Sequence, residues 1–223
     1  MAIRDNILDI NRQLPDGTRL VAVSKYRPVE ELREAYDAGQ RLLAESRPAE
    51  FAAKVGQLPE DIEWHFIGHL QTNKLKLVLP HCTLIHSVDS IRLLDSIQKY
   101  AAQNRLEVNV LIEVHIGAEE TKQGFTPKQT EELFADSGAL QARYPAIRFK
   151  GLMGMASHTD EVVRIESDFA LLEALFNKIR SGNAPEGFTE LSAGMSSDWQ
   201  IAVRHGATLV RIGSAIFNNR QNI

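Results

Sequence analysis

Short apolar runs alternate with amphipathic stretches along the whole sequence, and this pattern is compatible with few folds. Repeated strand–helix units are typical of a parallel sheet whose strands are joined by crossover helices. Such units either close into a barrel or spread into an open, doubly wound sheet. The runs predict eight strands, at residues 18–24, 41–45, 63–67, 83–87, 108–116, 147–153, 189–192 and 207–212.

Two of the amphipathic stretches, residues 1–14 and 161–180, have helical spacing of their apolar residues. We expect the first to be an extra N-terminal helix that packs against the rest of the fold. The apolar positions are Ile3, Ile7, Ile10 and Leu14 in the first stretch, and Val162, Ile165, Phe169, Leu172, Phe176 and Ile179 in the second. Asp89 is expected to cap the helix that carries Ile91, Leu94 and Ile97.

Three features favour the closed barrel. A barrel of this kind takes roughly 250 residues, and the chain has 223. An open nucleotide-binding sheet would normally show a glycine-rich turn after its first strand, but residues 24–28 (SKYRP) contain no glycine. The polar residues of interest also follow predicted strands. Because no Gly/Ser-rich or Pro-rich linker divides the sequence, we predict one α/β domain over residues 1–223, a (β/α)8 (TIM) barrel.

Composition excludes several classes of function. The chain is 43% hydrophobic and 24% charged with a net charge of -4, so it lacks a basic footprint for nucleic acid or anionic lipid. No apolar stretch has membrane-spanning length, and residues 1–14 do not resemble a signal peptide. Cys82 is the only cysteine, which excludes an internal disulfide. We expect a cytoplasmic protein.

Lys25 stands at the end of the first predicted strand. Moving an ammonium out of water is costly, so such a lysine has a charged partner, a shifted pKa, or a covalent bond through its amine. The alternative is that Lys25 lies on the rim of the barrel with its stem along the surface.

The last two predicted strands are followed by loops with glycine and hydroxyl groups, at residues 193–198 (AGMSSD) and 213–215 (GSA). A barrel phosphate site is commonly built from these two loops. The alternative is that Gly194 and Gly213 are turn glycines and the serines are helix caps.

Arg211 lies inside the eighth predicted strand, where alternation can point its side chain into the barrel mouth. An arginine only donates hydrogen bonds, so a pyridine nitrogen facing it would stay unprotonated. The alternative is an ion pair with Glu113 or Glu45.

The histidines are weaker candidates. His86 and Asp89 could form a hydrogen-bonded pair at the end of the fourth strand, but a role as helix cap already explains Asp89. His65 and His69 with Glu63 span a strand and a loop and lack the helical spacing of metalloprotease ligands, so no metal site is predicted.

Several blocks together closely resemble the pyridoxal phosphate homeostasis protein family, whose fold is similar to the N-terminal domain of alanine racemase. The resemblance runs from the N-terminal helix almost to the C-terminus. The blocks are residues 21–25 (VAVSK), 64–74 (WHFIGHLQTNK), 86–89 (HSVD), 151–155 (GLMGM), 194–196 (GMS) and 210–217 (VRIGSAIF).

This resemblance implies that pyridoxal 5'-phosphate is bound as a Schiff base on Lys25, with Arg211 at its pyridine nitrogen. It also implies that Ser196, Gly213 and Ser214 surround the phosphate. Three positions depart from the family pattern. Ser46 replaces an asparagine that usually contacts the ring region, while Ser214 replaces a threonine and Ala193 a methionine. We expect binding to survive these changes.

Family members are regarded as regulators of cofactor supply and of amino- and keto-acid balance. No catalytic activity is established for them. The resemblance therefore implies a non-catalytic carrier, with pyridoxal phosphate-dependent apoenzymes as possible recipients. Alanine racemases take a second acid/base group from a C-terminal domain of the partner subunit, and no such domain follows the predicted barrel, so a monomer is expected. The alternatives are a weak racemase with Lys25 as its only base, and a barrel enzyme for a phosphorylated metabolite without a Schiff base.

Overall fold

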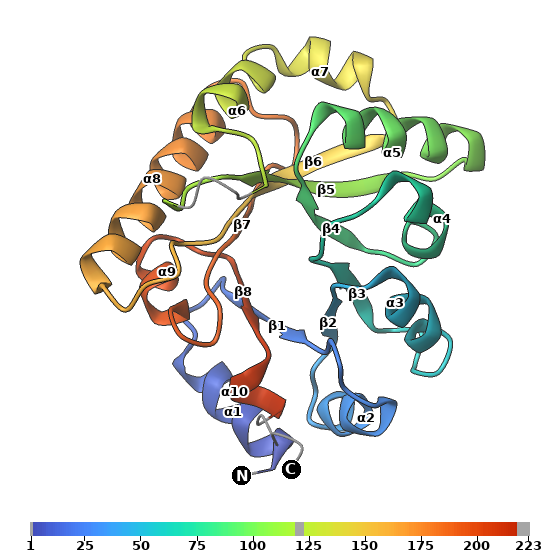
Figure 1. Ribbon diagram of the computed structural model, residues 1–223, viewed down its shortest axis with the longest axis vertical. Coiled ribbons are helices and arrows are strands. Elements are labelled where there is room, and N and C mark those ends of the chain that lie inside the picture. Colours follow the sequence, from blue (N-terminus) through green and yellow to red (C-terminus); the bar gives the residue numbers. More distant parts are fainter. Residues whose placement is uncertain (1, 119–122, 218–223) are drawn as a thin grey trace.

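Eight parallel strands close into a barrel in sequence order, with β8 paired to β1 (Figure 1). The computed structural model describes residues 2–118 and 123–217. The strands are β1 (Arg19–Val23), β2 (Leu42–Glu45), β3 (Glu63–Phe66), β4 (Leu84–Val88), β5 (Val108–Val114), β6 (Ile147–Gly154), β7 (Glu190–Ser192) and β8 (Leu209–Ile212). The closed barrel and all eight predicted strands are confirmed, and their ends agree with the prediction to within two residues.

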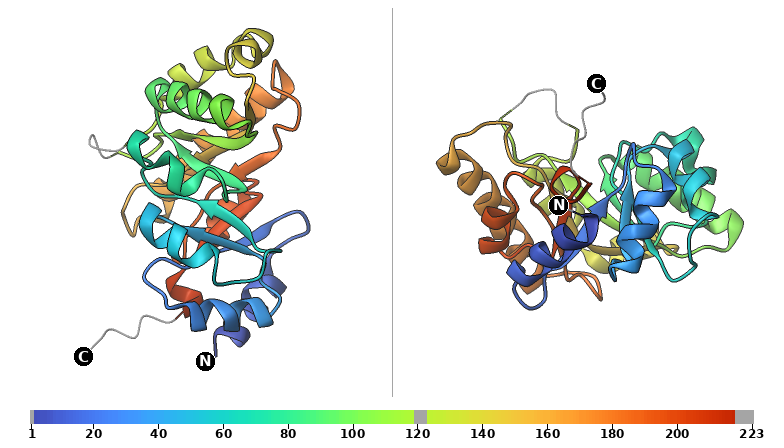
Figure 2. Two further views of the ribbon diagram at one scale, coloured as in Figure 1. Left: turned by 90° about the vertical axis from the view of Figure 1, so that its right-hand side faces the viewer. Right: turned by 90° about the horizontal axis from the view of Figure 1, so that it is seen from below.

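The helices lie outside the ring of strands and cover its outer face (Figures 1 and 2). They are α1 (Ile3–Gln13), α2 (Val29–Asp37), α3 (Pro48–Val55), α4 (Leu75–Val78), α5 (Ile91–Asn104), α6 (Pro127–Leu133), α7 (Ser137–Arg143), α8 (Val162–Ser181), α9 (Trp199–Arg204) and α10 (Ser214–Phe217), with a 3-10 turn η1 (Thr72–Lys74). Within the described residues, every helix falls short of the length or the apolarity that a bilayer crossing needs.

The predicted N-terminal helix is confirmed as α1. Its residues Ile3, Ile7 and Ile10 are buried, as their spacing predicts. The buried Asn6 donates a hydrogen bond of 2.7 Å from Nδ2 to the carbonyl of Ile216 in α10. This bond joins the first helix to the last, and the two lie side by side in Figure 1.

The helix over residues 161–180 is confirmed as α8, whereas the cap predicted for α5 is wrong. Val162 is 54% exposed, because side chains of a helix lean toward its N-terminus and the first one leans past the end. The other predicted residues of that face, Ile165, Phe169, Leu172, Phe176 and Ile179, are buried. Ser90, not Asp89, caps α5, since its hydroxyl accepts a hydrogen bond of 3.3 Å from the amide of Leu93.

The inside of the barrel is apolar at one level and polar at the next. Small and medium apolar side chains pack together within it, namely Val21, Ala44, Leu84, Leu111, Met153 and Leu209. Residues two positions further along a strand share the same face. Leu84 is therefore followed by His86, Leu111 by Glu113 and Leu209 by Arg211, all buried. This alternation places the polar groups toward the carboxyl ends of the strands.

Candidate functional site

A cleft of about 580 Å³ opens at the carboxyl ends of the strands. Its walls come mainly from the segments that end or follow β1, β2, β3, β6, β7 and β8, and Ile67, Met153, Met155 and Met195 form an apolar part of them. It also brings together all six residues that the sequence suggested for a cofactor site: Lys25, Ser46, Ser196, Arg211, Gly213 and Ser214. The structure therefore places these six residues around one cleft.

Lys25 lines the cleft with an exposed side chain. Among the described residues, none accepts a hydrogen bond or forms an ion pair with its amine. The charged partner considered from the sequence is therefore not found in this part of the structure. An accessible primary amine therefore lies at a cleft that is also lined by hydroxyl groups and a guanidinium.

The loops after β7 and β8 meet at Ser196. Its Oγ accepts hydrogen bonds from the amides of Gly213 (3.3 Å) and Ala215 (3.4 Å). Both distances are long for hydrogen bonds from an amide nitrogen to an oxygen, so these two amides are available to a stronger acceptor such as an anion. A Cβ at Gly213 would lie 3.1 Å from the carbonyl oxygen of Val23, which explains why glycine suits this close approach to β1.

Gly194 has a structural role in the same region. Its φ is +87°, and a Cβ there would lie 2.7 Å from the Cβ of Ala202. The turn-glycine interpretation of this residue therefore holds. This role of Gly194 is compatible with an anion site, because the turn places Ser196 at the cleft.

Arg211 is buried and points into the barrel, as strand alternation predicts. Its guanidinium donates hydrogen bonds of 2.6 Å to Ser192 Oγ and 3.1 Å to the carbonyl of Gly154. Burial lowers its pKa to about 10, so the group stays charged at neutral pH. The alternative of an ion pair with Glu113 or Glu45 is wrong for the described structure, and Glu45 is paired with Lys54 instead.

Two buried histidines continue the hydrogen-bond chain that begins with Arg211 and Ser192. His86 Nδ1 lies 2.9 Å from Ser192 Oγ, and His86 Nε2 lies 2.9 Å from His65 Nδ1. Because Arg211 can only donate, Ser192 Oγ accepts the hydrogen bond from the guanidinium, and His86 is the remaining partner of the hydroxyl among the described residues. The hydroxyl then donates to His86 Nδ1, and His86 Nε2–H donates to His65.

Both histidines are neutral, and their partners differ from those expected. Burial lowers the pKa of His65 to about 3 and the pKa of His86 well below its usual value. The predicted His86–Asp89 pair is wrong, because Asp89 lies 3.0 Å from His69 Nδ1. Within the described residues, no three His, Cys, Asp or Glu side chains gather as metal ligands would.

Sequence reasoning missed this network, although a signal for it exists. His86 is two residues from Leu84, so strand alternation places it inside the barrel. Ser192 ends β7 beside the cleft loops. The sequence could have identified these polar residues as a group at inward positions near strand ends. It could not have shown which of them form hydrogen bonds with one another.

Glu113 is the titratable group whose pH dependence is simplest to test. Burial, and then the nearby Asp89, raise its pKa from 4.5 to about 7. The folded protein keeps this proton where the unfolded chain has lost it, so stability should fall as pH rises from about 4.5 to about 7. We expect Glu113→Gln to match the parent near pH 4.5 and to be more stable at pH 8, by up to roughly 3 kcal/mol.

Urea unfolding of both proteins at the two pH values measures this difference. Glu60→Gln, at an exposed carboxylate, is the control and should show no such pH-dependent gain. An equal effect of Glu113→Gln at both pH values would contradict the expectation.

Comparison with known proteins gives consistent matches over the whole chain. Residues 1–221 match the family model described as alanine racemase, N-terminal domain. A pyridoxal phosphate homeostasis protein of Aquifex aeolicus (strain VF5) is 40% identical over 205 residues, which cover 91% of this chain and 87% of that protein.

Solved structures agree with this match. PipY of Synechococcus elongatus PCC7942 without PLP has a TM-score of 0.89 at 33% identity, covering 97% of this chain and 100% of that one. Its PLP-bound structure has a TM-score of 0.85 at 32% identity, with the same coverage. An alanine racemase of Clostridium difficile 630 has a TM-score of 0.76 at 15% identity, covering 99% of this chain and 56% of that one, a likeness of fold alone.

Proposed function

Because this chain belongs to the pyridoxal phosphate homeostasis protein family, we propose that it binds pyridoxal 5'-phosphate and acts in the homeostasis of this cofactor. The observation that carries the proposal is the composition of one cleft. An accessible amine, two hydroxyl-bearing loops with available amides, and a buried guanidinium all line it.

Each part of the cofactor matches a group of the cleft. Pyridoxal phosphate supplies an aldehyde when bound, and the amine of Lys25 can join its carbon covalently with release of water. Ser196, Gly213 and Ser214 offer hydroxyl and amide donors to its phosphate. The methionine side chains of the wall suit an aromatic ring, because thioethers pack favourably against aromatic edges.

Arg211 supports storage and delivery rather than catalysis. It donates to Ser192 and Gly154, which keep its guanidinium in place. A ring nitrogen placed against it would accept a hydrogen bond and stay unprotonated, which makes the ring a weak electron sink. We therefore propose a carrier without catalytic activity, with cofactor-dependent apoenzymes as recipients.

The loop at Ser46 is proposed to complete the site in place of the asparagine usual in the family. Gly68 lets this loop approach, since a Cβ at Gly68 would lie 2.1 Å from the carbonyl oxygen of Ser46. The Ser46 hydroxyl is shorter than an asparagine amide, so it would reach the ring region directly or through one water. We further propose that residues 1–223 form one domain that acts as a cytoplasmic monomer and has no nucleic-acid or membrane partner.

Loading the purified protein with the cofactor tests the function. We expect a yellow protein whose adduct, trapped by borohydride, maps to the peptide that contains Lys25. Pyridoxal, which lacks the phosphate, should bind at least about tenfold more weakly because it cannot use the charge-assisted contacts of the two loops. A colourless protein with no trapped adduct would contradict the proposal.

Solvent exchange separates a carrier from an enzyme. The loaded protein is mixed with amino acids in deuterated water, and the α-hydrogen is followed by mass spectrometry. We expect no exchange above that of free cofactor. Rapid exchange that depends on Lys25 would support a weak racemase instead.

A further inference from the structure

Lys25 occupies the centre of a strained turn. The amide of Arg27 donates a hydrogen bond of 3.1 Å to the carbonyl of Ser24, which closes a four-residue β-turn. Tyr26 has a φ of 62°, whereas Lys25 has no positive φ, and this is the pattern of a type II turn. Glycine or asparagine usually fills that position, so a tyrosine there costs on the order of 1 kcal/mol and needs support from its surroundings.

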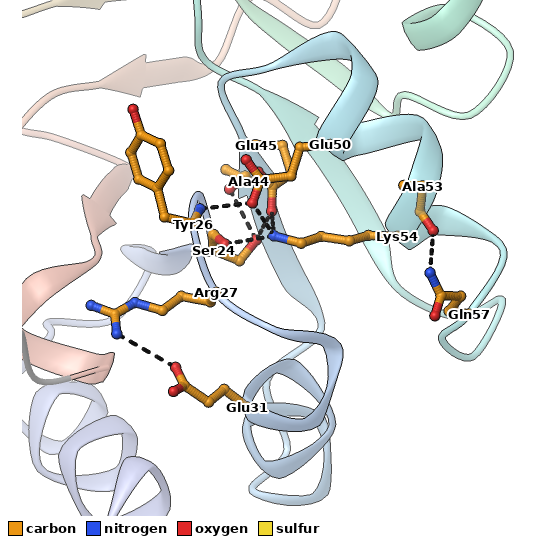
Figure 3. Close-up of polar contacts among 10 residues, drawn as sticks. All are labelled: Ser24, Tyr26, Arg27, Glu31, Ala44, Glu45, Glu50, Ala53, Lys54 and Gln57. Atoms are coloured by element: carbon orange, nitrogen blue, oxygen red, sulfur yellow. Dashed lines mark hydrogen bonds and ion pairs between the residues drawn. The ribbon is translucent and has the colours of Figure 1, made fainter. Parts of the chain in front are cut away.

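Two side chains of α3 bind this turn at Ser24 and at Tyr26 (Figure 3). Lys54 Nζ donates a hydrogen bond of 2.8 Å to the carbonyl of Ser24, the residue before Lys25. Glu50 Oε1 accepts one of 2.7 Å from the amide of Tyr26, the residue after it. Lys54 also donates to Glu50 over 2.6 Å, so the two side chains act as one unit.

The Glu50–Lys54 pair is also bound to the end of β2. Glu45, at the end of β2, has a fully buried side chain and accepts a hydrogen bond of 2.7 Å from Lys54 Nζ. Ser24 Oγ donates to the same carboxylate oxygen over 2.7 Å. The ends of β1 and β2 and the helix α3 are therefore joined at one ammonium group. None of these contacts involves the Lys25 amine, which stays accessible to the cleft.

We propose that Glu50 and Lys54 are positioning residues that fix the direction in which the Lys25 amine enters the cleft, and so set how tightly the covalently held cofactor is retained. The proposal rests on the proposed function. A covalent bond forms efficiently only when the reacting atoms are held in a narrow range of geometry. Among the described residues, no hydrogen bond or ion pair holds the Lys25 side chain itself. Its direction therefore depends on the backbone at Ser24 and Tyr26, which Lys54 and Glu50 bind.

Glu50 offers the sharper test of the two, because its side chain is 21% exposed and can be shortened without leaving a fully buried gap. Glu50→Ala removes the acceptor of the Tyr26 amide, whereas Glu50→Gln keeps an oxygen in the same place. Glu132→Ala is the matched control. It removes the carboxylate of another helical lysine pair, Lys128–Glu132, on α6.

Three readouts are measured on loaded protein: the rate of cofactor release into an excess of an aldehyde trap, the circular dichroism of the cofactor band, and the position of the borohydride-trapped adduct. The cofactor is achiral, so its circular dichroism reports how the protein orients it. We expect Glu50→Ala to release about tenfold faster with a changed band. Glu50→Gln and Glu132→Ala should stay within about twofold of the parent.

The outcomes distinguish the inference from the function on which it rests. If the parent is loaded on Lys25 and Glu50→Ala behaves like the parent, the positioning role is wrong and the proposed function stands. Equal effects of Glu50→Ala and Glu50→Gln would also overturn it, because the hydrogen bond to Tyr26 would then not matter. If the parent carries no adduct on Lys25, both proposals fail.

Should Glu50→Ala fail to fold, Glu50→Asp replaces it. This variant keeps the charge beside Lys54 and withdraws the carboxylate by one methylene group. Release that is faster than in the parent by several-fold supports the inference, and unchanged release overturns it.

Discussion

Lys25→Ala should lose the covalently attached cofactor and weaken its binding by at least about tenfold, or roughly 1.4 kcal/mol. The variant removes the accessible amine of the cleft but leaves the donors of the two loops and Arg211 in place. Binding should therefore persist in a non-covalent form, held by the phosphate contacts. Equilibrium dialysis gives the affinity, and borohydride trapping with peptide mapping gives the position of any adduct.

Lys178→Ala is the control for the loss of an ordinary lysine. Lys178 is exposed and pairs with Glu131 on the outside of the barrel. This variant should bind and trap the cofactor as the parent does. If Lys25→Ala retained the parent's affinity and rate of trapping, Lys25 would not be the attachment site.

Lys54→Met should lower the free energy of unfolding of the cofactor-free protein by about 3–5 kcal/mol. The methionine keeps most of the volume but leaves the buried Glu45 carboxylate without a cation. Burial already raises the pKa of Glu45, and Lys54 opposes this rise. In the variant the pKa should rise further, so the loss of stability should shrink as the pH falls and Glu45 takes up a proton.

The double variant Lys54→Met/Glu45→Gln should recover most of the lost stability, because no charge is then left buried. Lys128→Met is the control at an exposed pair and should change stability by less than about 1 kcal/mol. Urea unfolding at pH 7 measures all three variants. A loss in Lys54→Met no larger than in Lys128→Met would show that the buried pair has little effect on stability.

Much of the fold followed from local patterns in the sequence. The order of strands and helices was visible because each crossover helix has its own amphipathic period, as in α1. Arg211 was correctly expected to point inward, since it shares a strand face with the buried Leu209. The meeting of the loops at Ser196 and Gly213 followed from the preference of barrels for phosphate sites after their last two strands.

The hydrogen-bond partners inside the barrel were predicted less well. Asp89, three residues away, was considered as a partner of His86, but His86 contacts Ser192, which is 106 residues distant. An ion pair with one of two carboxylates was considered for Arg211. Its guanidinium donates instead to a hydroxyl and to a backbone carbonyl. Local proximity was a poor guide because side chains at the mouth of a barrel meet across it.

The sequence by itself determined which elements form and in which order, because periodicity and turn residues act over a few positions. It also determined that Lys25, Ser196 and Ser214 gather at one end, since all strands of a parallel barrel point the same way. Only the tertiary structure decided that Lys54 and Glu50 hold the turn of Lys25. Those contacts depend on the register of β1 against β2 and on where α3 packs, which no local pattern encodes.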